Sequence, residues 1–282
     1  MLALAATSAS AQQYRWVPGA NPLNWDPATV NWDEEPFGGV AEGGWVNGNP
    51  TSSALFTNFF PGVGVINVGP NVDVNSLVVT DAGFSFTGGN INFIGANGSI
   101  VNASGGNVNV GSSVSATDAL IITGGSAVTL NGPVNGTNNL ISFGAGSTVT
   151  MNGAVGLAGA AAVISNGSGA NMAFNSTLGA LGNLVIVGGN DVGLSGTTTV
   201  AGNLTISDAG TIVTSTAGLS TGTGIIVANG GAGIFAGSVS GAGGLTVTDG
   251  ALAVLNGANT FTGDTIGFGA GAVIIANGGS AP

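Results

Sequence analysis

The side chains of this chain that could carry out chemistry are almost all carboxylates. The sequence has 12 acidic residues but only one basic residue, Arg15, and it has neither histidine nor cysteine. In an extended segment, Asp33 and Glu35 would project from the same face. Glycoside hydrolysis needs two carboxyl groups about 5–10 Å apart. A β-helical glycan hydrolase or lyase that uses carboxylates alone is therefore the enzymatic alternative for this chain.

The acids beyond residue 60 do not suggest a second pair. The intervals between them differ, so they do not recur once per structural repeat. We expect them in turns and on the surface. The glycine-rich nonapeptide that binds calcium is also absent, and we expect no metal site and no catalytic residue. These acids are Asp73, Asp81, Asp118, Asp191, Asp208, Asp249 and Asp264.

The residue inventory excludes most other functional classes. Serine–histidine triads and histidine metal sites need a histidine, and a P-loop needs a lysine. The chain contains neither, and its net charge is −11. Binding to nucleic acid requires lysine or arginine to displace counterions from the phosphates. We therefore expect no cofactor and no nucleic-acid partner.

All four tryptophans lie in the first 60 residues, together with the only tyrosine, Tyr14. The first coil of a stacked fold has no neighbour on one side, so residues 12–60 could cover it as an N-terminal cap. The same rings could instead form a glycan-contact patch. We favour the cap and expect its one short helix over residues 51–60. The tryptophans concerned are Trp16, Trp25, Trp32 and Trp45.

The elements that must position these residues are short strands. From residue 63 onward, apolar runs rich in valine and isoleucine alternate with clusters of glycine, asparagine, serine and threonine, as in Val72-Asp-Val74 and Leu245-Thr-Val247. Such runs, about 8–12 residues apart, are typical of many strands joined by tight turns. We predict an all-β fold in which residues 61–282 form a parallel β-solenoid that continues, or associates with another copy, beyond residue 282. With three strands in a coil of about 20–27 residues, it would have about eight to eleven coils. A β-sandwich is the rival fold.

The first eleven residues bear on the subcellular location of the protein. They form a small apolar segment that ends in Ala9-Ser10-Ala11, a pattern similar to a signal-peptide cleavage site. We interpret residues 1–11 as the remnant of a signal peptide. No other segment approaches the 18 or more apolar residues of a membrane span, so we expect a protein outside the cytoplasm with no membrane span in this chain.

The segment GGLTVTDGALAVLNGANTFTGDT covers residues 243–265. It resembles the autotransporter-associated β-strand repeat of bacterial surface proteins, although Val247 stands where that repeat usually has lysine. The resemblance implies a right-handed parallel β-helix, exported and held at or beyond the outer membrane, and it names no catalytic residue. The positions that carry it are Gly243, Gly244, Leu245, Asn256, Gly257, Asn259, Thr260, Phe261, Thr262, Gly263 and Thr265.

These observations lead to one functional hypothesis and two alternatives. The leading hypothesis is a non-enzymatic, extracellular, adhesin-like β-solenoid on the surface of a Gram-negative-type bacterium. Its partners would be further copies of itself, which could form filaments or matrix, or other cell-surface proteins and glycans. The alternatives are the carboxylate-based hydrolase or lyase and a binding module. That module would bind carbohydrate through the tryptophans, or ice through Thr-x-Thr pairs.

Overall fold

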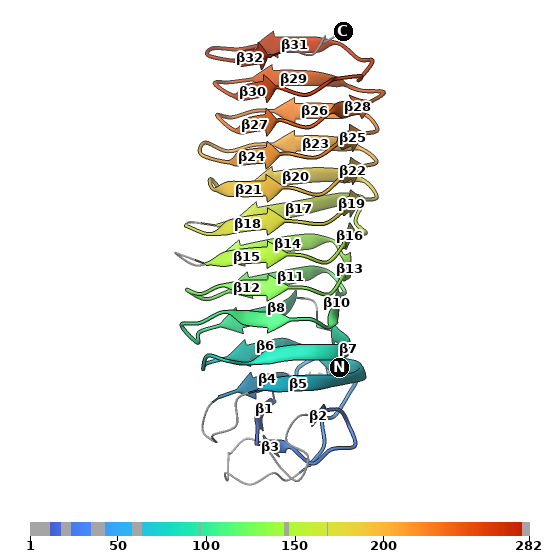
Figure 1. Cartoon of the computed structure of the whole chain (residues 1–282), viewed down its shortest axis with the longest axis vertical. Coiled ribbons are helices and arrows are strands. Elements are labelled where there is room, and N and C mark those ends of the chain that lie inside the picture. Colours follow the sequence, from blue (N-terminus) through green and yellow to red (C-terminus); the bar gives the residue numbers. More distant parts are fainter. Residues whose placement is uncertain are drawn as a thin grey trace, which may run out of the picture.

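The structure is a computed structural model that describes residues 12–17, 24–34, 43–57, 64–95, 97–143, 147–167 and 169–277. Within these ranges every regular element is a strand. The strands stack as a β-solenoid of about ten turns, with the N-terminal segment at one end (Figure 1). The predicted all-β parallel solenoid with an aromatic N-terminal cap is confirmed. The predicted signal-peptide remnant, residues 1–11, lies outside the described residues.

One side of the solenoid is a sheet of 13 strands. Its first pair, β1 and β3, is antiparallel, and from β1 onward each strand pairs in parallel with its counterpart on the next turn. The strands are β1 (Gln13–Trp16), β3 (Trp32–Glu34), β4 (Ser53–Phe56), β6 (Ser76–Val79), β8 (Asn97–Asn102), β11 (Ala119–Thr123), β14 (Asn139–Phe143), β17 (Ala161–Asn166), β20 (Asn183–Val187), β23 (Asn203–Ile206), β26 (Gly224–Val227), β29 (Gly244–Thr248) and β31 (Thr265–Phe268).

The remaining 19 strands form a second, bent sheet. One arm contains β2 (Asn24–Trp25), β5 (Val65–Val74), β7 (Ser85–Phe93), β9 (Val108–Val110), β12 (Val128–Leu130), β15 (Thr148–Met151), β18 (Asn171–Phe174), β21 (Asp191–Leu194), β24 (Ile212–Ser215), β27 (Ala232–Phe235), β30 (Leu252–Leu255) and β32 (Val273–Ala276). The other contains β10 (Ser113–Ala116), β13 (Val134–Thr137), β16 (Val155–Leu157), β19 (Leu178–Ala180), β22 (Thr198–Val200), β25 (Leu219–Thr221) and β28 (Val239–Gly241). The long strands β5 and β7 run through both arms.

The turns have nearly the same length. Residues that bond across adjacent turns are separated by 20 positions at Asn183 and Asn203 and by 24 positions at Asn139 and Val163. This spacing lies within the predicted coil length. Because each turn pairs with the turn before and the turn after, the backbone hydrogen bonds run along the axis of the stack.

The core follows from strict alternation along the strands. In β5, for example, Val72 and Val74 are fully buried while Asp73 between them is partly exposed. Successive side chains of a strand point to opposite faces, so one residue in two enters the narrow interior. The stacked interior residues form one continuous hydrophobic cluster from the cap to the last turns.

The helix expected over residues 51–60 is absent from the part that the structure describes. Residues 53–56 form β4, in which Ala54 and Phe56 are buried and Ser53 and Leu55 are only partly covered. An apolar run this short fits both the two-residue period of a strand and the 3.6-residue period of a helix. Pairing with β1 on one side and β6 on the other selects the strand. Residues 58–60 lie outside the described ranges.

Two glycines of the repeat-like segment lie where adjacent turns approach closely. A Cβ atom on Gly243 would overlap the backbone carbonyl of Thr223 on the preceding turn. A Cβ atom on Gly244 would overlap the carbonyl oxygen of Asp264 on the following turn. Glycine is therefore required here for close backbone approach.

Asparagine side chains form ladders along one corner of the stack. The Nδ2 atom of Asn175 donates to Oδ1 of Asn152 at 2.9 Å, and Nδ2 of Asn152 donates to Oδ1 of Asn131 at 2.7 Å. The same bond joins Asn277 to Asn256 in the last turns, at 3.0 Å. These asparagines help to hold successive corners in register.

The final described turn, formed by β31 and β32, differs from the others. Each of its strands pairs with a described neighbour on one side only, β29 or β30. Ile274 packs on the core, but four other large apolar side chains of this turn are exposed, with Phe268 at 57%. No helix in the described ranges is long and apolar enough to span a membrane.

Candidate functional site: a pocket in the N-terminal cap

The four tryptophans of the cap are packed into one aromatic cluster. Their exposed fractions range from 0% for Trp25 to 4% for Trp16. The ring centroids of Trp32 and Trp45 are 4.8 Å apart, and those of Trp25 and Phe56 are 5.3 Å apart. Phe56 in turn contacts Phe86 of the solenoid at 4.8 Å. Aromatic rings at these separations and tilts pack favourably, so the cluster joins the cap to the first turns.

Strand pairing and one indole bond also attach the cap to the solenoid. Trp25 in β2 lies opposite Val68 of β5 in a parallel pair. The Nε1 atom of Trp45 donates to the backbone oxygen of Asp73 at 2.8 Å. The burial of the rings supports the interpretation of the tryptophans as a cap, because a sugar needs an open ring face on which to stack.

Asp33, the described half of the predicted carboxylate pair, lies in an ion pair. An Nη2 atom of Arg15 donates to Oδ2 of Asp33 at 2.5 Å, and Asp33 is fully buried. The two residues are directly opposite each other in the antiparallel pair of β1 and β3. The carboxylate is therefore paired with the guanidinium. Glu35 lies outside the described residues.

The ion pair gives a stability prediction. Replacing Arg15 with glutamine should lower the free energy of unfolding by about 2 kcal/mol, because a buried carboxylate loses a charge-assisted hydrogen bond. Urea unfolding near neutral pH measures the change. The double variant Arg15→Met/Asp33→Leu removes both charges and should recover most of the loss. If Arg15→Gln leaves the unfolding midpoint unchanged, the pair does not stabilise the cap.

Acids of the solenoid occupy hydrogen-bonded and turn positions. Asp73 accepts a bond from Asn92 at 2.8 Å, and Asp81 accepts one from Thr57 at 2.8 Å. Asp208 and Asp249 are exposed in turns with positive φ. Among the described residues, no three metal-ligating side chains come together. Within those residues, the acids form the turn and surface groups that their spacing predicted.

The repeat-like segment uses its polar residues for turn-to-turn contacts. Asn259 is buried, its Nδ2 atom donates to the backbone oxygen of Gly257, and its Oδ1 atom accepts from the amide of Val239. Phe261 is buried beside it in the core. Asn259 thus accepts the bond of the Val239 amide through its side chain, while the backbone oxygen of Val239 accepts from the amide of Thr260.

The Thr-x-Thr pairs do not form a continuous array. Thr150 stacks on Thr129, but its other neighbour is Ala173. Thr214 lies between Gly193 and Ile234. These neighbours interrupt any regular row of hydroxyl groups.

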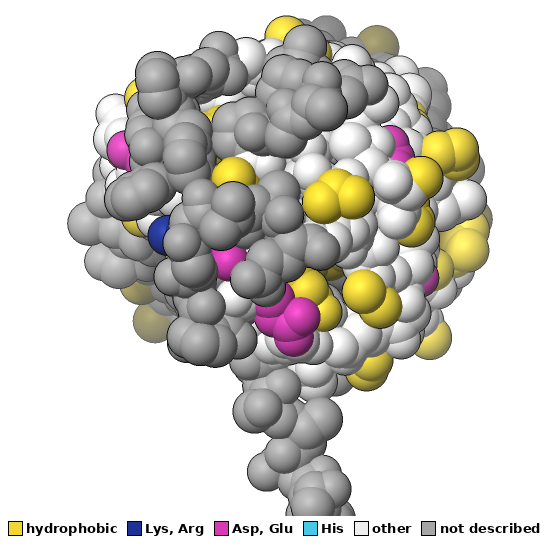
Figure 2. Space-filling view, turned by 90° about the horizontal axis from the view of Figure 1, so that it is seen from below, with side chains coloured by type: hydrophobic (Ala, Val, Ile, Leu, Met, Phe, Trp, Pro, Cys, Tyr) yellow, Lys and Arg dark blue, Asp and Glu magenta, His cyan; other side chains and the backbone are white. Residues whose placement is uncertain are grey.

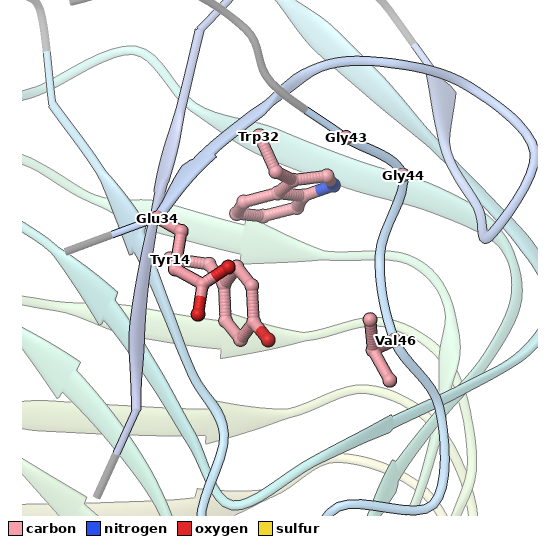
Figure 3. Close-up of a pocket in the computed structure, with 6 residues that line it drawn as sticks. All are labelled: Tyr14, Trp32, Glu34, Gly43, Gly44 and Val46. Atoms are coloured by element: carbon pink, nitrogen blue, oxygen red, sulfur yellow. The ribbon is translucent and has the colours of Figure 1, made fainter. Parts of the chain in front are cut away.

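The cap does contain a pocket, which we call the cap pocket. It has a volume of about 430 Å³ and is lined, among the described residues, by Tyr14, Trp32, Glu34, Gly43, Gly44 and Val46. Tyr14 and Glu34 lie side by side, and the segment from Gly43 to Val46 forms the opposite wall (Figure 3). Cavities that bind small molecules typically measure about 300–1,000 Å³.

Strand pairing explains why these side chains meet. Tyr14 of β1 is directly opposite Glu34 of β3, and Trp16 is opposite Trp32. Because side chains alternate, Tyr14 and Glu34 lie on one face of the pair while Arg15 and Asp33 lie on the other. An isolated bridge between Trp32 and Gly43 holds the other wall beside β3.

Burial raises the pKa of the Tyr14 phenol, and the neighbouring Glu34 carboxylate raises it further, while the nearby Ser52 hydroxyl acts in the opposite direction. The phenol therefore stays neutral at physiological pH. Of the described lining residues, Glu34 is the one that carries charge, and it is exposed at the pocket mouth.

Comparisons with protein-family models, with curated proteins and with solved structures find no match for this chain. The fold alone defines its class, a parallel β-solenoid with an aromatic cap. The resemblance to the autotransporter-associated repeat rests on the residues of the segment itself.

Proposed function

We propose that this chain is a non-enzymatic structural solenoid, a stiff adhesin-like arm displayed outside the cell by a Gram-negative-type bacterium. The observation that supports this proposal is the uninterrupted stacking of about ten turns with interior columns of valine, isoleucine and leucine. In such a stack each repeat stabilises its neighbours, and the outcome is an extended body with long lateral faces. The signal-like N-terminus and the autotransporter-like repeat support export.

Three measurements test the proposal. Electron microscopy of the purified chain should show rods, and protease treatment of intact cells of the source organism should remove the protein from the outside. Incubation with bacterial and plant polysaccharides should release no sugar. Turnover of a polysaccharide, or protection of the protein inside intact cells, would contradict the proposed role.

The final described turn supports a further part of the proposal, end-to-end association. Ile266, Phe268, Val273 and Ile275 are each at least 40% exposed, on a turn whose strand edges have one described partner each. Ile266 and Phe268 belong to one sheet, and Val273 and Ile275 belong to the other. Strand edges that lack a partner on one side favour pairing with another strand, and exposed apolar side chains favour being covered. We propose that a further layer of β-strand covers this turn, supplied either by polypeptide that continues the stack or by a second copy of the chain.

Replacing Phe268 with aspartate should therefore shift the protein toward monomer in sedimentation velocity. We expect the dissociation constant of association to rise about tenfold or more, since burying an aspartate in an apolar contact is unfavourable. The control is Leu181→Asp, at a side chain that is 77% exposed on the side of the stack. Equal effects of the two variants, or a wild-type protein that is monomeric at all concentrations, would rule out end-to-end contact through this turn.

A further inference from the structure

We propose that the cap pocket binds a small organic ammonium ion, with the Glu34 carboxylate as its charge partner. This inference concerns a ligand site and is independent of the structural role proposed for the stack. It rests on the position of Glu34, on the charge inventory of the whole chain and on the shape and walls of the pocket.

No side chain of the protein can neutralise Glu34. Arg15 is the only basic residue in the entire sequence. It is bound to Asp33 on the opposite face of the β1–β3 pair. A cation that pairs with Glu34 must therefore come from outside the chain, and a second copy has no lysine to offer. Figure 2, which views the molecule from the cap end, shows acidic side chains at several places on this surface.

The pocket favours a monovalent cation with an organic body over a metal ion. Divalent metal ions need several oxygen ligands that converge, whereas Glu34 is the one carboxylate among the described lining residues. The neutral phenol of Tyr14 adds a hydroxyl group beside it (Figure 3). An ammonium group has three hydrogen-bond donors, and a carboxylate and a hydroxyl are suitable acceptors.

The other walls suit the carbon skeleton of such a ligand. Val46 is half exposed and lies across the cavity from the Tyr14 ring (Figure 3). Gly43 and Gly44 present backbone without side chains. Ligand pockets commonly combine apolar walls with a few polar groups that fix the orientation of the ligand. Amino sugars and small biogenic amines have this combination of charge, hydroxyl groups and carbon.

The test compares two related amino sugars, one charged and one neutral, by isothermal titration calorimetry near neutral pH. Glucosamine carries an ammonium group, and N-acetylglucosamine has the same ring without the charge. We expect glucosamine to bind at least about tenfold more tightly, which corresponds to about 1.4 kcal/mol. In Glu34→Gln, the affinity for glucosamine should fall to that for N-acetylglucosamine. Circular dichroism should show an unchanged fold, because Glu34 is exposed.

The matched control is Asp208→Asn. It removes the same amount of charge from an exposed turn beyond β23, and asparagine accepts the positive φ of that position. Glucosamine affinity should be unchanged in this variant. Equal loss in both variants would show non-specific attraction to an acidic protein. Equal binding of the two sugars would indicate a site for neutral saccharide, and no binding of either would also refute the proposal.

Discussion

Replacing Gly243 with alanine is expected to lower the free energy of unfolding by about 3 kcal/mol, because the added methyl group does not fit into a site that is already packed. The new methyl group would overlap the carbonyl carbon and oxygen of Thr223 and the amide nitrogen of Gly224, all on the preceding turn. Because these atoms belong to the backbone, no side-chain rotation can relieve the overlap. The two turns would have to separate, which weakens the hydrogen bonds between them.

The measurement is urea unfolding followed by circular dichroism, with Gly218→Ala as the control. A Cβ atom on Gly218 would meet its nearest neighbour, Oγ of Ser238, at an ordinary 3.5 Å. Alanine at such a site leaves stability unchanged or raises it by up to about 1 kcal/mol, because the unfolded chain loses freedom. If both variants have the urea midpoint of the wild type, the backbone at Gly243 does not approach the backbone at Thr223 as closely as the structure shows.

Loss of the Trp25 ring should have the largest effect of any single change in the cap. Trp25 is fully buried and contacts Trp32, Trp45, Phe56 and Phe86. Truncation of a buried tryptophan to alanine typically costs about 3–5 kcal/mol, because burial is lost and a cavity remains. We expect Trp25→Ala to lower the urea midpoint strongly and to promote aggregation, since the first turns of the stack would lose their cover.

Trp25→Phe should retain part of the lost stability, because it fills part of the cavity. The control Val46→Ala, at a residue that is 52% exposed, should change stability by less than about 0.5 kcal/mol. The same variants separate the two interpretations of the tryptophans. A Trp25→Ala protein that is as stable as wild type but has lost binding on a glycan array would favour the glycan-contact patch over the cap.

The architecture of the stack could be predicted because it depends on a local pattern. Alternation such as Val108-Asn-Val110 places every second residue inside, and β9 buries both valines. Frequent glycine and asparagine mark the turns between such runs. Residues 53–56 show where this reasoning fails. Ser-Ala-Leu-Phe, with three apolar residues in four, fits either a strand or the start of a helix, and only the neighbours in space decide between them.

The cap pocket could not be predicted from the sequence for the same physical reason. Glu34 faces Tyr14 because β1 and β3 pair in antiparallel register, and no local pattern specifies this pairing between residues 20 positions apart in the sequence. The acidic run that contains Glu34 suggested instead a pair formed by Asp33 and Glu35. Alternation along Trp32-Asp33-Glu34 is the signal in the sequence that could have placed Glu34. If the Trp32 side chain points into the cap, Glu34 lies on the same face of the strand and Asp33 lies on the opposite face.

The turn-by-turn pairing of the solenoid has a mechanical consequence. Each strand in the body of the stack is bonded to the strands directly before and after it along the axis. A force applied to one end would therefore detach single turns in succession, and the rest of the stack would stay folded. Each event would release about 65–85 Å of extended polypeptide, so the molecule would lengthen in steps under load and dissipate energy at each one.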